Sequence, residues 1–337
     1  MADADLVLEG GGVKGAGLVG ALSVLTGAAD PYTFHRIAGT SAGAIVASLL
    51  AAGYGPGELK QVMTELDFSQ FEDESSVFKH FKRLGEGFGL IFEEGLFRGD
   101  FLHSWIAGKL AAKGVHTWGQ LKDLDPNSSL PPERQYKLVV VVSDVSRGRE
   151  LRLPWDYQSL CGVSPDDQPV ADAVRASASI PFFFRPFRMQ ADKAVTGGHG
   201  EILCTDGGML SNFPIDIFDR TDAKVPRWPT LGVKLSARQQ AIDPAWQPNP
   251  GPLELAKSLI STMTNAHDQM YVSDPSFSSR TIFVDTTSFK ATDFHLTDAD
   301  KTTLFDNGTA AGTAFLSTWD WAAWKAQYSG TGSRSTT

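Results

Sequence analysis

Two short segments near the start of the chain each stop at closely spaced glycines and continue into small apolar residues. The first is the apolar run 6–8, before the glycines of 10–15, and the second is 34–38, before the glycines of 39–43. Short segments of this kind that end in glycines predict strands and turns, and the small residues after them predict helices. Strand, turn and helix in that order, twice over, indicate a parallel or mixed sheet with helices on its faces.

The alternation of predicted strands and helices continues along the chain. Further strands are expected at 137–143, 202–204, 230–235 and 281–284, and further helices at 172–178 and 253–271. We therefore expect an α/β fold of three layers, α/β/α, around a mixed and mostly parallel sheet. A single domain is expected over 1–328, with a cap-like insertion around 68–101 and a disordered Ser/Thr/Gly-rich tail at 329–337.

The composition describes a globular chain and limits its partners. Hydrophobic residues make up 42% of the 337 residues and charged residues 20%, which excludes a disordered polymer. Lys and Arg number 30 against 39 Asp and Glu, a net charge of −9. This balance argues against nucleic acid as a partner, because binding phosphates requires clustered basic residues.

The stretch 37–57 is uncharged and long enough to suggest a transmembrane helix. Its five glycines and Pro56 favour a strand, a turn and a buried helix instead. The start of the chain, 1–5, is acidic and lacks the basic region of a secretory signal. We therefore expect a cytoplasmic protein without a transmembrane helix, with peripheral contact with membranes left open.

The first glycine cluster is Gly10, Gly11, Gly12 and Gly15, after one predicted strand and at the start of a helix. Backbone N–H groups in such a turn can point at an anion. The spacing also fits the dinucleotide fingerprint G-x-G-x-x-G, which needs an acidic residue at the end of the second strand. That strand ends at Gly39 without an acid, so a nucleotide-dependent protein is disfavoured.

The second cluster, Gly39, Ser41 and Gly43, has the G-x-S-x-G pattern of a nucleophilic serine on a sharp strand-to-helix turn. Only about 40 residues precede Ser41, room for one strand and one helix before its own strand. A conventional α/β-hydrolase has several strands ahead of its serine. Ser41 is therefore a candidate nucleophile in a different architecture.

Asp206, followed by Gly207 and Gly208, ends a predicted strand and is the favoured partner of Ser41. An ordinary aspartate is a weak base for a serine hydroxyl, but burial would raise its pKa and make the pair workable. The alternative for this motif alone is an Asx turn in an exposed loop. For His267 and His295 a surface or helix-capping role is the better interpretation, and for His199 a flexible loop.

Together the three motifs, in this order and spacing, resemble the patatin-like phospholipase family. The similarity extends to four further blocks and covers roughly residues 5–320. These blocks are 95–99 (GLFRG), 117–121 (TWGQL), 173–181 (AVRASASIP) and 212–214 (NFP).

The resemblance implies a lipid acyl hydrolase with a Ser–Asp dyad, Ser41 as nucleophile and Asp206 as general base. Backbone N–H groups of Gly11, Gly12 and Lys14 would form the oxyanion hole, and the reaction would pass through an acyl-enzyme on Ser41. Lys14 stands where many relatives have arginine, which matters little for a hole built from the main chain. The implied substrate is a lipid or another acyl ester, and neither a metal nor a cofactor is expected.

Two other functions remain open on the sequence: a soluble short-chain esterase and a non-catalytic lipid-binding protein. The phenylalanine-rich insertion, 68–101, also has two interpretations. It could be an amphipathic cap that meets the lipid surface over an acyl-binding cleft. It could equally be a helix whose aromatic face packs on the core.

Overall fold

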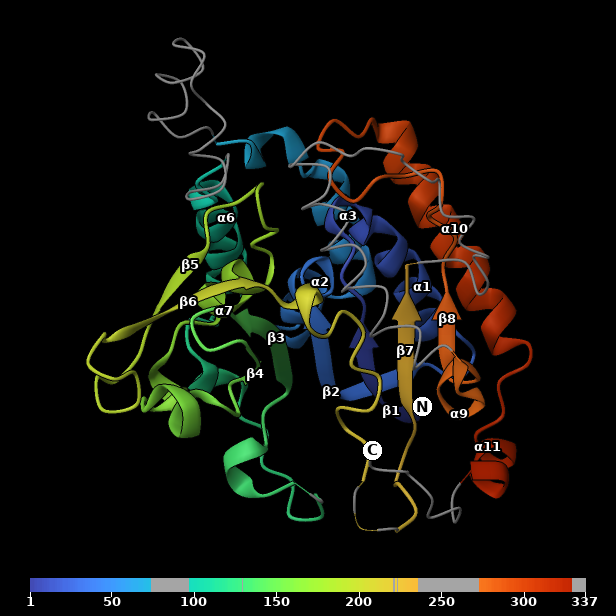
Figure 1. The fold of residues 1–337 in the computed structure, drawn as a ribbon. Coiled ribbons are helices and arrows are strands. Elements are labelled where there is room, and N and C mark those ends of the chain that lie inside the picture. Colours follow the sequence, from blue (N-terminus) through green and yellow to red (C-terminus); the bar gives the residue numbers. More distant parts are fainter. Residues whose placement is uncertain (74–96, 129, 221, 223, 236–272, 329–337) are drawn as a thin grey trace, which may run out of the picture.

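Eight strands of the described residues form one central sheet (Figure 1). The structure is a computed structural model, and it describes all residues except 74–96, 129, 221, 223, 236–272 and 329–337. The strands are β1 (Ala2–Leu8), β2 (Tyr32–Thr40), β3 (Leu138–Asp144), β4 (Arg149–Leu153), β5 (Phe187–Gln190), β6 (Glu201–Asp206), β7 (Thr230–Lys234) and β8 (Thr281–Phe283).

The order across the sheet is β5-β6-β3-β2-β1-β7-β8, and β4 pairs with β3 off this path. The neighbours from β3 to β8 are parallel, whereas β4 and β6 each pair with β3 antiparallel and β5 pairs with β6 antiparallel. The expected α/β fold with a mixed, mostly parallel sheet is therefore confirmed.

Helices connect these strands and cover the sheet. They are α1 (Gly15–Gly27), α2 (Ala42–Ala51), α3 (Pro56–Glu65), α6 (Asp100–Ala111), α7 (Val170–Ser177), α9 (Pro275–Ser278), α10 (Asp298–Leu316) and α11 (Trp321–Tyr328). The predicted helix at 253–271 lies outside the described residues, as do most of the predicted cap and the predicted tail. No described helix has the length and apolarity needed to cross a membrane, and 37–57 forms the predicted strand, turn and helix.

Both faces of the sheet are buried, which the alternation along β1 shows. Leu6 and Leu8 belong to the large core that includes the apolar side chains of α1, α2 and α3. Val7 points into a smaller core on the other face, where the described residues of 213–218 cover it. An apolar strand end of this kind, at 6–8, is typical of a parallel sheet covered on both sides.

β1 begins four residues earlier than predicted. The prediction missed its first half because that half contains acidic residues, one of which is buried. Asp5 is only 1% exposed, and Arg36 of β2 binds both of its carboxylate oxygens. Burial raises the pKa of Asp5, and the guanidinium beside it opposes that rise. Asp5 therefore belongs to the strand itself, where it forms an ion pair with the neighbouring strand, and not to a loop before it.

Candidate active site

Ser41 lies at the turn between β2 and α2 in a strained conformation. Its φ is 51° and its ψ is −121°, a backbone geometry that costs a non-glycine residue about 1–3 kcal/mol. The turn is closed by glycines: a Cβ on Gly39 would lie 2.3 Å from the carbonyl oxygen of Gly43, and one on Gly43 would lie 2.2 Å from that of Leu8. The G-x-S-x-G pattern thus forms the sharp strand-to-helix turn that it predicts.

Asp206 lies next to Ser41. The Ser41 hydroxyl donates to Asp206 Oδ2 at 2.7 Å, and the backbone N–H of Gly208 donates to Oδ1 at 2.7 Å. The two side chains are almost fully buried, with residue exposures of 5% and 7%. Burial raises the pKa of Asp206 from 3.8 to about 6, although both hydrogen bonds lower it. The carboxyl group is therefore a stronger base than an exposed aspartate.

The sheet brings these two residues together across a third strand. Thr40, at the end of β2, is paired with Val141 of β3. Asp206, at the end of β6, is paired with Val142 of the same strand. Because β6 runs antiparallel to β3, its last residue reaches the region where β2 gives way to the turn. Residues 165 positions apart in the chain thus meet at one place.

The glycine-rich turn after β1 lies against Ser41. A Cβ on Gly10 would be 3.1 Å from the Cβ of Ser41. Within the described part of the chain, the N–H groups of Gly11 and Gly12 have no acceptor. Lys14 N–H donates to the Gly11 carbonyl at 3.3 Å. Of the three predicted oxyanion donors, two therefore keep an N–H available and the third already has an acceptor.

A buried ionic network, which the motifs did not reveal, supports this turn. Glu9 accepts hydrogen bonds from Lys234 Nζ and from the N–H of Leu235 on β7 and just beyond it. Asn212 Nδ2 donates to Glu9 at 3.3 Å and to the Gly10 carbonyl at 3.2 Å. The sequence offers one signal for this network: Glu9 directly follows an apolar predicted strand, and Lys234 is a charged residue within another predicted strand.

The Lys14 side chain takes part in a different contact. Its Nζ donates to Thr286 Oγ1 at 3.3 Å, and burial lowers the pKa of Lys14 while Glu9 opposes the change. Thr286 in turn donates to the Leu235 carbonyl at 2.7 Å. The lysine thus helps to tie the glycine-rich turn to the segment after β7.

An apolar pocket of about 450 Å³ opens at Ser41. Apart from the serine hydroxyl, its walls are side chains of aliphatic and aromatic residues together with glycines. Two of them, Phe68 and Phe71, come from the beginning of the predicted cap, and both are buried. Its other large apolar lining residues include Ile45, Met63, Leu66, Leu102, Ile180, Phe184 and Phe294.

Neither the described histidines nor a metal cluster offers an alternative centre near Ser41. The side chain of His295 is 71% exposed and lies 3.4 Å from Glu72; His199 is exposed, and His267 lies outside the described residues. In the part of the chain that the structure describes, no group of three or more His, Cys, Asp or Glu side chains is placed to hold a metal ion.

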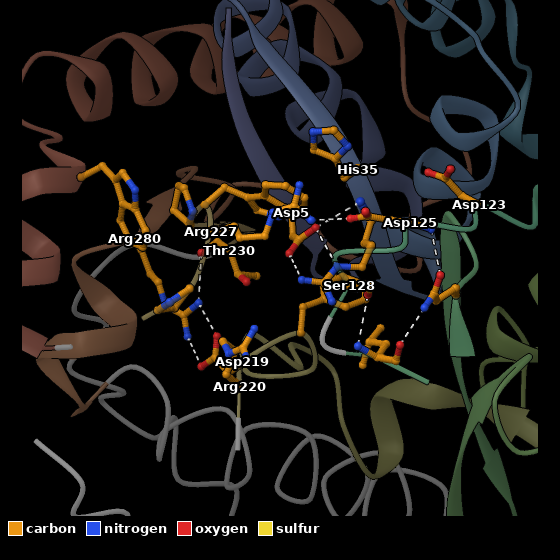
Figure 2. Close-up of a pocket in the computed structure, with 18 of the residues that line it drawn as sticks. Asp5, His35, Asp123, Asp125, Ser128, Asp219, Arg220, Arg227, Thr230 and Arg280 are labelled. Carbon is orange, nitrogen blue, oxygen red and sulfur yellow. Dashed lines mark hydrogen bonds and ion pairs between the residues drawn. The ribbon is translucent and has the colours of Figure 1, made fainter. Parts of the chain in front are cut away.

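A larger hollow, of about 770 Å³, lies where β7 and β8 begin and is drawn in Figure 2. Ser41 and Asp206 do not line it. Each of its four arginines is paired with a carboxylate: Arg36 with Asp5, Arg280 with Asp219, Arg227 with Asp125, and Arg220 with Asp222.

Comparisons with known proteins show which family the chain resembles. A family model described as "Patatin-like phospholipase" matches residues 6–219. The chain is 36% identical to the uncharacterized protein YqhO of Bacillus subtilis over 315 residues, which cover 94% of this chain and 98% of YqhO. It is 25% identical to the probable lipid hydrolase 463L of invertebrate iridescent virus 6 over 218 residues, which cover 63% of this chain and 62% of that protein.

Among solved structures, VipD from Legionella pneumophila matches with a TM-score of 0.51 and 19% sequence identity. The match covers 93% of this chain, which spans only 66% of VipD, and it shows a shared fold. The family model covers more than half of the chain, and YqhO is similar over nearly its full length. The chain belongs to the patatin-like phospholipase family.

Proposed function

We propose that this protein hydrolyses fatty-acyl esters of lipids, with Ser41 as nucleophile and Asp206 as general base. The observation that carries the proposal is the 2.7 Å hydrogen bond from the Ser41 hydroxyl to Asp206 Oδ2. It lies at an apolar pocket of the kind that an acyl chain requires. Family membership and the relative described as a probable lipid hydrolase support the same class of reaction.

In the first half of the reaction, Ser41 Oγ attacks the ester carbonyl carbon and its proton passes to Asp206 Oδ2. The tetrahedral intermediate then collapses, the bond to the alcohol oxygen breaks, and protonated Asp206 returns the proton to that leaving oxygen. The alcohol or lysolipid departs and the acyl group stays on Ser41. The raised pKa of Asp206 suits both directions of this transfer, because the carboxyl group can accept and release a proton near neutral pH.

In the second half, water replaces the alcohol. Asp206 accepts a proton from a water molecule that attacks the acyl-enzyme carbonyl carbon, and the bond to Ser41 Oγ then breaks. The proton on Asp206 returns to Ser41, and the fatty acid leaves. The chemistry of this cycle needs neither a metal nor a cofactor.

Negative charge develops on the carbonyl oxygen in both halves, and backbone N–H groups of the glycine-rich turn are its proposed donors. Gly11 and Gly12 are favoured, because the N–H of Lys14 already has an acceptor. One such donor contributes roughly 3 kcal/mol to transition-state stabilisation in other serine hydrolases.

The test is hydrolysis of phosphatidylcholine vesicles and of p-nitrophenyl butyrate and palmitate by wild type, Ser41→Ala and Asp206→Asn. We expect wild type to cleave the long-chain substrates and both variants to be inactive while folded. Asp216→Asn is a control, since Asp216 is an acid that does not line the pocket at Ser41. Wild-type rates in Asp206→Asn would refute the dyad.

The remaining candidate functions give different results in the same assay. A short-chain esterase would cleave the butyrate ester and leave the palmitate ester and the vesicles intact. A non-catalytic lipid-binding protein would bind the vesicles without release of fatty acid and would not react at Ser41 with a fluorophosphonate probe. The hydrogen-bonded pair of Ser41 and Asp206 favours a catalytic function over a non-catalytic lipid-binding function.

A further inference from the structure

The end of α7 makes a hydrogen bond to the backbone of Ser41. The N–H of Ser41 donates to Ser177 Oγ at 2.8 Å, and the Ser177 hydroxyl donates to the Val141 carbonyl on β3 at 2.6 Å. Ser177 is fully buried, and its single hydroxyl proton and an acceptor lone pair are used by these two bonds. The hydroxyl thus links the turn that carries Ser41 to the neighbouring strand.

Two residues after Ser177, Ser179 binds the backbone at Asp206. The Ser179 carbonyl accepts hydrogen bonds from the N–H of Asp206 at 3.0 Å and from Thr205 Oγ1 at 2.7 Å. Ser179 is itself anchored, because its hydroxyl donates to the Arg175 carbonyl at 2.9 Å. Ser179 and Ser177 are both fully buried, so water cannot replace these contacts without reorganising the core.

The hydrogen bond from the Ser41 N–H to Ser177 also affects the conformation of the proposed nucleophile. Ser41 has a positive φ, and a strained residue persists only where its surroundings fix it. Without Ser177, the Ser41 N–H would be a buried donor that lacks a partner, a loss that favours relaxation of the turn. Because this N–H is already bound, it is also not free to serve as an oxyanion donor.

From these contacts we infer that the segment 177–179 is a brace that sets the separation of the serine and the aspartate, with Ser177 as the positioning residue for the nucleophile. The brace reaches Ser41 through a side chain and Asp206 through a main-chain carbonyl. Figure 1 shows α7 beside β3 and β6, which it contacts. The inference rests on the proposed function, since it concerns how the proposed dyad is held.

The test compares Ser177→Ala with Ser48→Ala. Both remove a hydroxyl from a fully buried serine, but Ser48 only donates to the Ile45 carbonyl within α2. Circular dichroism and thermal melting first establish that each variant is folded. Should Ser177→Ala fail to fold, Ser177→Cys takes its place, because the thiol keeps the size and weakens both hydrogen bonds.

With p-nitrophenyl butyrate, we expect Ser177→Ala to lower kcat by about 10- to 100-fold, since a displacement of about 1 Å can reduce a rate by that much. KM should stay close to the wild-type value, because Ser177 does not line the substrate pocket. Labelling of Ser41 by a fluorophosphonate should slow by the same factor. Ser48→Ala should match wild type in all three measurements. A folded Ser177→Ala with wild-type kcat would overturn the inference.

Hydrogen exchange at the Ser41 amide tests the brace without any turnover. We expect the amide to be protected in wild type and in Ser48→Ala, and to exchange faster in Ser177→Ala. Equal protection in Ser177→Ala would refute the brace even in an active enzyme. Conversely, an inactive wild type with a protected amide that Ser177→Ala exposes would refute the proposed function and leave the brace supported.

Discussion

In the proposed mechanism the carboxylate of Asp206 serves the reaction, whereas its burial destabilises the fold, and Asp206→Asn separates the two effects. The side chain is buried, and two hydrogen bonds, from the Ser41 hydroxyl and from Gly208 N–H, do not compensate for its burial. An amide of the same shape carries no charge to desolvate. We therefore expect Asp206→Asn to be inactive and more stable than wild type at neutral pH.

The size of this effect follows from the pKa of Asp206, which burial raises from 3.8 to about 6. At about 1.4 kcal/mol per pH unit, the native state loses roughly 3 kcal/mol relative to the unfolded chain as the group ionises. The sign of the effect follows from a pKa that is higher in the folded protein than in the unfolded chain. The loss of folding stability caused by Asp206 is absent below pH 3.8, grows between pH 3.8 and about 6, and reaches its full size above about pH 6. For 337 residues, unfolding entropy of about 0.7 kcal/mol per kelvin turns 3 kcal/mol into about 4 °C.

The assay is urea and thermal unfolding of both proteins from about pH 4 to about pH 8. Asp144→Asn is the matched control, because Asp144 is also fully buried but pairs with Arg147. Its replacement leaves the partly buried guanidinium of Arg147 without its carboxylate and should destabilise the protein at pH 7. Asp206→Asn should gain stability over wild type as the pH rises. A variant less stable than wild type at pH 7, or a difference independent of pH, would refute the reasoning.

Three further results are expected from the same site. The value of kcat/KM should fall tenfold per pH unit below about pH 6, where Asp206 takes up its proton; a flat acidic limb in a stopped-flow pH profile would contradict this. Ser41→Gly should be about 1 kcal/mol more stable than Ser41→Ala in urea, because glycine accepts the positive φ; equal stability would argue against strain. Gly12→Ala, whose Cβ would lie 1.9 Å from a carbonyl oxygen at φ +58°, should lower both stability and activity, whereas Gly57→Ala, in α3 with open space around it, should leave activity unchanged and should not lower stability.

The parts of the site that depend on local backbone geometry could be predicted from the sequence. Gly39 and Gly43 allow a close approach of main chain to main chain, so their spacing around Ser41 specifies the turn without reference to any distant residue. Asp206 was identifiable because it ends an apolar strand and is followed by glycines. Their contact at 2.7 Å follows from the order of the strands, which the family resemblance implied and spacing alone did not.

The side chains that support the turns could not be predicted. Ser177 lies 136 positions from Ser41 and reaches it only because α7 packs on β3. Glu9 and Lys234 are 225 positions apart and meet because β1 and β7 are neighbours in the sheet. Nothing in the pattern around any of these three residues specifies the tertiary contact. Asp5 was misread for the same reason, since its partner comes from another strand.

The placement of β3 between β2 and β6 also fixes when the proposed dyad of Ser41 and Asp206 can form. The serine is translated early, but its turn also depends on Ser177, and the aspartate ends a strand that begins at Glu201. β6 can pair with β5 alone, but it joins the central sheet only through β3, and pairings this distant in the chain form slowly. A chain emerging from a ribosome therefore carries Ser41 without Asp206 while the next 165 residues are added. An unfinished chain is unable to attack lipids by the dyad mechanism.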